Sequence, residues 1–178
     1  MPPTFGAANS VTAVRAVLVA LAATAIGRSP AASVAWLLVS AAIAATVLDG
    51  VDGWAARTLG QSSAFGARFD MEVDAALIMV LSVVAWAWGK AGAWVILSGL
   101  LRYLFVAAGW IWPWMSRALE PKRRRQTVCV IQVVALIVVV SPIAMPPFST
   151  IAAGVALAVL VWSFAIDTVW LYGRKQVA

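Results

Sequence analysis

Long apolar runs follow one another along nearly the whole chain, and each is about as long as a membrane-crossing helix, roughly 20 residues. Proline, glycine and charged residues separate the runs. Only 11% of the 178 residues are charged and 63% are hydrophobic, whereas a soluble domain carries about 25% charged residues. A soluble globular fold is therefore excluded. The predicted spans are residues 11–27, 31–57, 65–89, 91–112, 127–140 and 149–172.

These runs predict an all-α, polytopic integral membrane protein with six transmembrane helices. Six helices use roughly 120 residues, so the rest of the chain suffices for short connections within a single membrane domain, residues 1–178. An even number of spans puts both termini on one side. The connections on the other side hold only Arg28 and Lys90 as basic residues. The side of the termini holds Arg57, Arg68, Arg117, Lys122, Arg123, Arg124, Arg125, Arg174 and Lys175. The positive-inside rule then predicts cytoplasmic termini in a multi-pass protein of the cell membrane.

The residue types that are missing restrict the chemistry. The chain has no histidine and a single cysteine, Cys129, which excludes imidazole bases, histidine-ligated metals, internal disulfides and thiolate clusters. Carboxylates, arginines, lysines and hydroxyls remain, and carboxylate oxygens suit hard cations such as Mg²⁺ or Mn²⁺. The formal net charge of +6 reflects the basic residues beside the predicted spans, and no nucleic-acid partner is expected.

Five of the seven acidic residues lie in the second and third predicted spans or their connection: Asp49, Asp52, Asp70, Glu72 and Asp74. A carboxylate in a membrane segment costs about 2.5 to 3.5 kcal/mol at the bilayer centre and less near the interface. Such a cluster is retained only with positive charge among its members. Pairing with Arg57 and Arg68 alone is one alternative, but two arginines do not neutralise five carboxylates. Bound cations are the preferred interpretation.

Helical spacing puts four of the aspartates on two facing stripes. Positions three, four and seven residues apart share one face of a helix, as do Asp49, Asp52, Gly53 and Ala56. Positions four and eight residues apart do so as well, here Gly66, Asp70 and Asp74. The connection between the two stripes is short, so their helices are expected to be antiparallel neighbours. The four aspartates then face each other across a cleft on the cytoplasmic side, whereas Glu72 lies off the stripe and is not expected to be a ligand.

A pattern of eight fixed residues runs from Asp49 to Asp74. It reads D-x-x-D-G-x-x-A-R, eight further residues, and G-x-x-x-D-x-x-x-D, with the fixed positions at Asp49, Asp52, Gly53, Ala56, Arg57, Gly66, Asp70 and Asp74. This pattern resembles the signature of the CDP-alcohol phosphatidyltransferases at every fixed position. The resemblance implies an enzyme that moves a phosphatidyl group from CDP-diacylglycerol to a small alcohol and releases CMP. It further implies a homodimer surrounded by membrane lipids.

The same resemblance implies that the aspartates hold two divalent ions, Mg²⁺ or Mn²⁺. One ion would be bound by Asp49, Asp52 and Asp70, and the other by Asp49, Asp70 and Asp74. Asp74 is expected to be the general base that takes the proton of the acceptor hydroxyl. Because no imidazole exists, a carboxylate has to serve as the base. Two metal ions can clamp both the attacking and the leaving oxygen.

The resemblance also assigns contacts to the CDP part of the donor, namely Gly53, Ala56, Arg57, Ser63 and Gly66. The first span begins with residues similar to the family's P-N-x-x-T-x-x-R pattern, with Ala8 in place of proline. This similarity favours Asn9 and Thr12 as further donor contacts and makes Arg15 a candidate. A simple helix cap is an equal alternative for Asn9.

Basic residues of the fourth span and at the start of the fifth are the candidates for binding a phosphorylated acceptor: Arg102, Arg124 and Arg125. An arginine in a membrane helix is a functional candidate by default. Glycerol 3-phosphate is the first expectation, although Tyr103 follows Arg102 where phosphatidylglycerophosphate synthases typically carry glutamate. Inositol phosphate or another alcohol is the alternative acceptor, and contacts with lipid headgroups are the alternative role of the basic run.

Two questions stay open at this point. Asp167 in the sixth span either pairs with an arginine such as Arg102 or faces the interface. A divalent-cation transporter that uses the aspartates is the rival function from another class. Transport needs a polar path across the bilayer, and the outer halves of the predicted spans offer no matching polar residues. The enzyme is therefore the preferred prediction.

Overall fold

The computed structural model describes the backbone of residues 7–59, 64–116 and 123–175, and their side chains except at 7–10, 52–59, 64, 65, 67 and 175. All regular structure in these ranges is helical, which confirms the predicted all-α class. The long helices are α1 (Ala7–Ala23), α2 (Ala32–Leu59), α3 (Ala64–Ala87), α4 (Leu97–Ile111), α5 (Arg123–Val140) and α6 (Phe148–Lys175). The short 3₁₀ helices η1 (Ala93–Ile96) and η2 (Pro113–Ser116) flank α4.

Three segments among the described helices are long and apolar enough to cross a membrane: Ala32–Val51, Ala93–Ile111 and Phe148–Arg174. The apolar stretch of α1, Val11–Ala23, is shorter, and α3 and α5 carry several charges near their first turns. Apolar side chains on the outside of α6 are largely exposed, with fractions of 60% for Val155 and 72% for Val169. Because soluble monomers rarely expose large apolar surfaces, these helices indicate a membrane protein.

Each predicted span overlaps one of the long helices, but several ends differ. Helix α1 begins at Ala7 and ends at Ala23 instead of covering residues 11–27, because hydrogen-bonded turns replace its last part. The fourth span is divided into η1 and α4. Helix α5 begins at Arg123 instead of residue 127, since arginine is a good helix former although it ends the apolar pattern.

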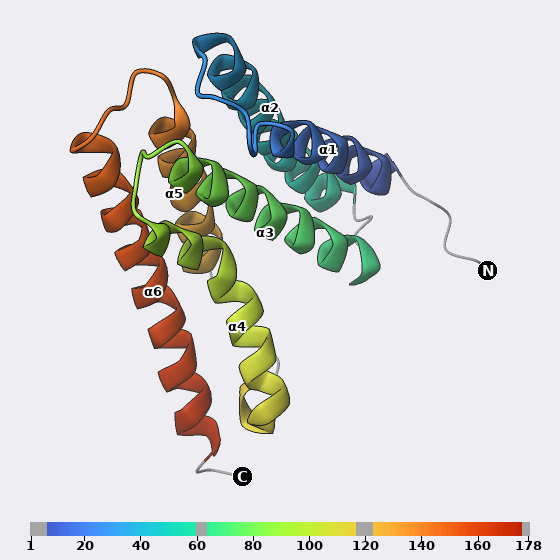
Figure 1. Ribbon diagram of the computed structural model, residues 1–178. Helices are drawn as coiled ribbons and strands as arrows, with labels where there is room; N and C mark the ends of the chain where they lie inside the picture. Colours follow the sequence, from blue (N-terminus) through green and yellow to red (C-terminus); the bar gives the residue numbers. More distant parts are fainter. Residues whose placement is uncertain (1–6, 60–63, 117–122, 176–178) are drawn as a thin grey trace.

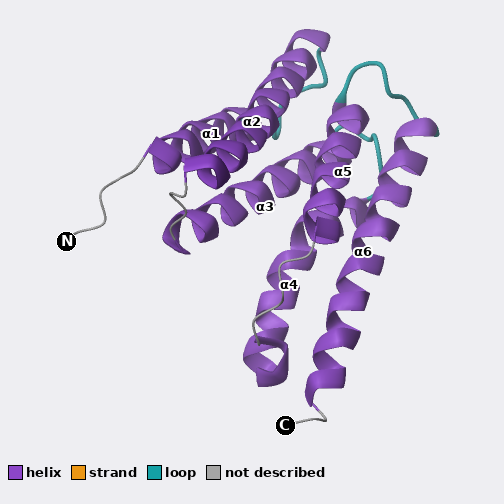
Figure 2. Ribbon diagram, turned by 180° about the vertical axis from the view of Figure 1, so that it is seen from behind, coloured by secondary structure: helices purple, strands orange, loops and turns teal. Residues whose placement is uncertain are grey.

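Helix α3 is the central element of the bundle. It packs against α1, α4 and α5, while α1 pairs with α2 and α5 pairs with α6. Helices α4 and α6 run side by side, away from the α1–α2 pair (Figures 1 and 2). Along α3, Leu77, Leu81 and Val84 are at most 2% exposed, because spacings of four and three residues place them on one stripe. This position lets the polar residues of α3 meet partners from several helices.

Helices α3 and α4 approach each other most closely at Gly99. A Cβ atom at this position would lie 2.6 Å from the Cα atom of Met79, which is too close for any side chain. Packing, and not backbone conformation, therefore requires glycine here. The contact fixes the separation between α3, which carries the acidic residues, and α4, which carries Arg102.

Helix α3 ends in a glycine-dependent cap. Gly89 has a φ of 67°, a left-handed conformation that glycine adopts without strain. The backbone N–H of Lys90 donates to the carbonyl of Ala85 at 2.9 Å, and that of Gly89 donates to Trp86 at 2.9 Å. This pair of bonds is the Schellman arrangement, and it turns the chain toward η1.

Hydrogen bonds join the three segments that connect α1 to α2, α3 to η1 and α5 to α6 at one end of the bundle. The Trp88 indole N–H donates to the Arg28 carbonyl at 2.9 Å. The Lys90 ammonium, which is 7% exposed, donates to the carbonyls of Ser141 at 3.2 Å and Ala144 at 2.5 Å. The Ser149 hydroxyl donates to the Lys90 carbonyl at 2.7 Å. Lys90 therefore joins α3 to the connection between α5 and α6.

Lys90→Met is expected to lower the free energy of unfolding by about 2 kcal/mol, because it leaves two carbonyls without their charged donor. The measurement is thermal unfolding in detergent, where a loss of this size lowers Tm by several degrees. Arg28→Met, in the neighbouring connection, is the matched control, since the Arg28 side chain is exposed. Equal Tm values for the two variants would contradict the role given to Lys90.

Candidate metal centre

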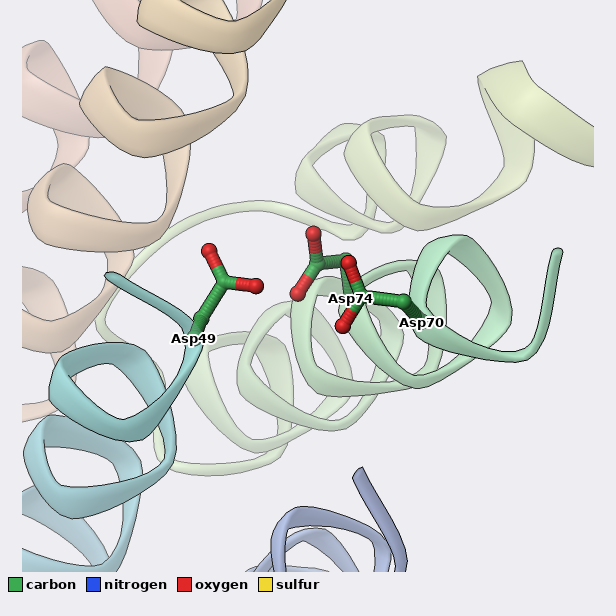
Figure 3. A group of neighbouring side chains, drawn as sticks. All are labelled: Asp49, Asp70 and Asp74. Carbon is green, nitrogen blue, oxygen red and sulfur yellow. The ribbon is translucent and has the colours of Figure 1, made fainter. Parts of the chain in front are cut away.

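Three aspartates from α2 and α3, the two helices that pack on α1, meet at one place. Asp70 and Asp74 are one turn apart on α3, and Asp49 extends toward them from α2 (Figure 3). One carboxylate oxygen from each lies within 4.8 Å of those of the other two. All three side chains are partly buried, with exposed fractions of 32% for Asp49, 35% for Asp70 and 27% for Asp74. The structure thus brings together three of the four predicted aspartates, and the side chain of Asp52 lies outside the described residues.

The guanidinium of Arg15, on α1, lies among these carboxylates. Its Nη1 atom is 2.9 Å from Asp49 Oδ1 and also pairs with Asp70, and its Nη2 atom pairs with Asp74. Its Nε–H donates to the Ala45 carbonyl on α2 at 3.0 Å. Only 1% of the Arg15 side chain is exposed. One arginine therefore contacts all three aspartates and the backbone of the helix that carries Asp49.

Sequence reasoning expected positive charge in the cluster but considered only Arg57 and Arg68 as internal neutralising partners, whereas the structure places Arg15 there. The signal was present, because an arginine within an apolar helix marks a functional position by default. Thr12, one turn before Arg15, is 2% exposed and lies on the same face of α1. Both residues owe their position to the packing of α1 against α2 and α3.

A small cavity of about 20 Å³ adjoins the aspartates, with room for about one water molecule. It is lined by Thr46, Asp49, Asp74, Leu77, Cys129, Val130 and Val133. Helix α5 therefore borders the cluster at Cys129. Arg125 lies four residues before Cys129, which puts it one turn away on the same face of α5.

A larger groove of about 600 Å³ lies elsewhere, beside α6, and is entirely apolar or small in its lining: Trp94, Gly154, Leu157, Ala158, Val161 and Trp162. None of these side chains offers a ligand for a metal ion or a charged partner for a phosphate. The groove therefore contributes no chemistry, although it is much larger than the cavity beside the aspartates.

Arg102 of α4 pairs with Glu72 of α3, with 2.5 Å between Nη2 and Oε1. Glu72 thus points to α4 and away from the aspartates, as its place off their stripe predicts. The Nε atom of Arg102 is buried and has no hydrogen-bond partner among the described residues. Arg102 therefore retains a donor for a further oxygen ligand.

Arg124 of α5 is held by α6. Its Nη1 atom donates to the carbonyl of Ser163 at 2.8 Å and to its hydroxyl at 2.6 Å, and its Nη2 atom is 2.5 Å from Asp167 Oδ1. The Nε atom of Arg125 lies 3.8 Å from Asp167 Oδ2. Asp167 therefore pairs with the basic run of α5 and not with Arg102. The three predicted acceptor arginines fall into two groups, one facing α3 and one facing α6.

Comparison with known families decides the assignment. The family model described as CDP-alcohol phosphatidyltransferase matches residues 5–166. The chain belongs to the CDP-alcohol phosphatidyltransferase family. It is therefore a transferase that moves a phosphatidyl group from a CDP-alcohol to an alcohol, and the rival function of a cation transporter is set aside. Comparisons with curated proteins and with solved structures found no match.

The aspartates of this CDP-alcohol phosphatidyltransferase suit a divalent ion. Carboxylate oxygens are the preferred ligands of Mg²⁺ and Mn²⁺, and here three carboxylates from two helices converge. When all three aspartates are ionised, they and Arg15 together carry a net charge of −2, which attracts a divalent cation. The donor set and its charge therefore fit the metal that this family uses.

The family signature continues beyond the described side chains. Helix α2 continues as far as Leu59, so its backbone carries Gly53, Ala56 and Arg57, but their side chains and that of Asn9 lie outside the described residues, as does Ser63 altogether. Gly66 lies in the first turn of α3, four residues before Asp70, and is partly exposed. The donor contacts of these residues remain predictions.

Proposed function

We propose that this enzyme transfers the phosphatidyl group of CDP-diacylglycerol to a small phosphorylated alcohol and releases CMP. Glycerol 3-phosphate is the first candidate acceptor, and inositol phosphate or another alcohol is the alternative. The observation that carries the proposal is the convergence of Asp49, from α2, with Asp70 and Asp74, from α3. The apolar helices around them support a lipid donor, and arginines near the same helices support an anionic acceptor.

The proposed ligands of the divalent ions, Mg²⁺ or Mn²⁺, are Asp49, Asp52, Asp70 and Asp74. When bound, two ions would supply positive charge to the diphosphate oxygens of the donor. The proposed contacts of the CDP part come from α1, α2, α3 and the connection between α2 and α3: Asn9, Thr12, Gly53, Ala56, Arg57, Ser63 and Gly66. Arg57 offers a fork of N–H donors that matches a phosphate.

Asp74 is the proposed general base. The acceptor hydroxyl forms a new bond from its oxygen to the phosphorus that carries the diacylglycerol. The bond from that phosphorus to the bridging oxygen breaks, and CMP leaves with the electron pair. The hydroxyl proton passes to the carboxylate of Asp74. Within the cluster of Asp49, Asp70 and Asp74, Asp74 is the least exposed, at 27%. It also borders the cavity toward α5, which supports its position beside an acceptor that α4 and α5 would bind.

The phosphate of the acceptor is proposed to bind Arg102 and Arg125, with Arg124 holding the position of α5 and lending further positive charge. Arg102 has an unpartnered Nε, and its partner Glu72 is 54% exposed and can be replaced by an anion. Arg125 has only a long contact of 3.8 Å to Asp167. Arg124 makes three short bonds to α6, so fewer of its N–H groups remain to bind a phosphate.

We further propose that all six helices cross the cell membrane, with both termini and the aspartates toward the cytoplasm, and that the enzyme works as a homodimer. The connections α1–α2, α3–η1 and α5–α6 gather at one end. Arg28 and Lys90 are their only basic residues. This asymmetry supports the proposed orientation through the positive-inside rule.

The proposal is tested with the purified chain in vesicles that contain CDP-diacylglycerol and Mg²⁺. Glycerol 3-phosphate, inositol phosphate and the two unphosphorylated alcohols are added separately, and CMP release is measured. The expected result is release with one phosphorylated acceptor and little with the corresponding free alcohol. Equal CMP release with phosphorylated and free alcohols would contradict the phosphate-binding role of the arginines. No CMP release with any alcohol would contradict the proposal that CDP-diacylglycerol is the donor.

Arg102→Gln is expected to raise the KM for the phosphorylated acceptor by about tenfold or more, because a charge-assisted hydrogen bond to phosphate is lost. The KM for CDP-diacylglycerol should change little. Arg28→Gln serves as the matched control, since it removes an exposed arginine from the connection between α1 and α2. An unchanged acceptor KM in the Arg102 variant would remove this residue from the acceptor site.

A further inference from the structure

We propose that Arg15 is an internal counter-cation of the metal centre: it holds the aspartates together when no metal is bound and is displaced from them when divalent ions bind. This inference rests on the proposed function, because it requires that the aspartates bind metal. It adds a positioning residue from α1 to a site otherwise built from α2 and α3.

The need for a counter-cation follows from the distances. Three ionised carboxylates with oxygens within 4.8 Å of one another repel strongly, and the repulsion grows where water is partly excluded. Arg15 contacts all three carboxylates at once. Without metal, the contacts of Arg15 therefore offset the repulsion among the three carboxylates.

The guanidinium and a metal ion compete for the same atoms. Arg15 pairs with the Oδ1 atom of Asp49, Asp70 and Asp74, and carboxylate oxygens are the atoms that a divalent ion takes as ligands. Two cations at one position would also repel each other. Binding of the ions therefore requires that the guanidinium withdraw from the oxygens it now contacts. The bond from Nε to the Ala45 carbonyl uses an atom that makes no contact with the aspartates, and it keeps Arg15 close to the centre.

Two consequences distinguish this role from a merely structural one. Arg15 stabilises the metal-free protein more than the metal-bound protein, because the ions take over the neutralisation of the aspartates. Arg15 also weakens metal binding, because its ion pairs are lost when the ions bind. A residue that only packed α1 against α2 and α3 would stabilise both forms equally and leave the metal affinity unchanged.

The test uses Arg15→Gln and two readouts that do not depend on activity. The first is Mn²⁺ affinity, measured by electron paramagnetic resonance titration of the purified chain. We expect Mn²⁺ to bind at least about tenfold more tightly to the variant, since the competing charge is gone. The second is Tm in EDTA and in saturating Mn²⁺. We expect a loss of roughly 10 °C in EDTA and a much smaller loss with Mn²⁺.

Arg15→Lys covers the case in which Arg15→Gln does not fold without metal. Lysine keeps the charge but lacks the planar fork that contacts three carboxylates. The expected result is a Tm loss in EDTA that Mn²⁺ removes, with an Mn²⁺ affinity close to that of the unaltered protein. Arg28→Gln is the control for the loss of one positive charge, because its exposed side chain lies in a distant connection; both readouts should stay unchanged.

The outcomes separate the two proposals. If the unaltered protein binds Mn²⁺ but each Arg15 variant loses equal Tm with and without the ion, or Arg15→Gln binds the ion no more tightly, the counter-cation role is wrong and the metal centre stands. If the unaltered protein binds no divalent ion, the metal centre is wrong and the role of Arg15 is wrong with it. Tighter binding together with metal-reversible destabilisation supports both.

Discussion

Asp74→Asn is expected to lower the rate of CMP release by about 1,000-fold, within the range that a general base contributes. Asparagine matches aspartate in size and still offers a carbonyl oxygen, but it does not accept the proton of the acceptor hydroxyl. The loss should appear in kcat, measured at saturating CDP-diacylglycerol, acceptor and Mg²⁺. Binding of the donor should be largely preserved, because the assigned CDP contacts lie on α1, α2 and the start of α3.

Asp70→Asn is the matched comparison for this variant. It removes one carboxylate charge from the same helix and the same cluster, but from a residue assigned only to the metal ions. We expect high Mn²⁺ concentrations to restore part of the activity of Asp70→Asn and none of that of Asp74→Asn. Equal restoration of both variants, or loss of donor binding with unchanged residual turnover in Asp74→Asn, would contradict the assignment of Asp74 as the base.

Removal of divalent ions has the second large expected effect. A metal ion contributes several kcal/mol of charge stabilisation to phosphoryl-type transfer, which corresponds to a rate loss of at least about 1,000-fold when it is removed. EDTA should therefore reduce CMP release to background, and Mg²⁺ or Mn²⁺ added in excess should restore it. Tm measured in parallel shows whether the chelated protein is still folded, as the contacts of Arg15 with the aspartates lead us to expect.

Asp49→Asn tests the metal centre by removing one proposed ligand instead of the ions. Asp49 is the described aspartate contributed by α2, and its replacement should raise the Mg²⁺ concentration needed for half-maximal activity by about tenfold or more, because the charge of the ligand set falls. Glu72→Gln removes a carboxylate that pairs with Arg102 instead, so it should leave this Mg²⁺ requirement unchanged. Activity that survives EDTA in the unaltered protein would contradict the metal centre.

Much of the fold followed from local pattern. Apolar runs separated by proline and glycine predicted the helical class and the approximate position of each helix, and four-residue spacing predicted that Asp70 and Asp74 share a face. These features depend on neighbours in the sequence. The start of α5 was missed, because three arginines interrupt the apolar pattern there, and the bonds of Arg124 to Ser163 and Asp167 on α6 show what holds this turn.

The pairing of charges did not follow from the sequence. Arg15 meets Asp70 across 55 residues and Asp74 across 59, and which arginine reaches which carboxylate depends on how α1 packs against α2 and α3. In the same way, Asp167 had two open alternatives until the packing of α5 on α6 selected Arg124. Helical periodicity predicts the face of the helix on which a residue lies. The oppositely charged residue that it pairs with depends on tertiary contacts between segments distant in the sequence.

The bonds of Trp88 and Lys90 have a consequence for how a bulky lipid reaches the aspartates. They tie together the three connections at one end of the molecule, so the helices are least free to separate there. We expect the helices to separate more readily at the opposite end, while the connections joined by these bonds stay together. With the proposed donor and orientation, the acyl chains would enter between the helices at that end from the bilayer, and loosening the tied connections would slow this entry without changing the reacting groups.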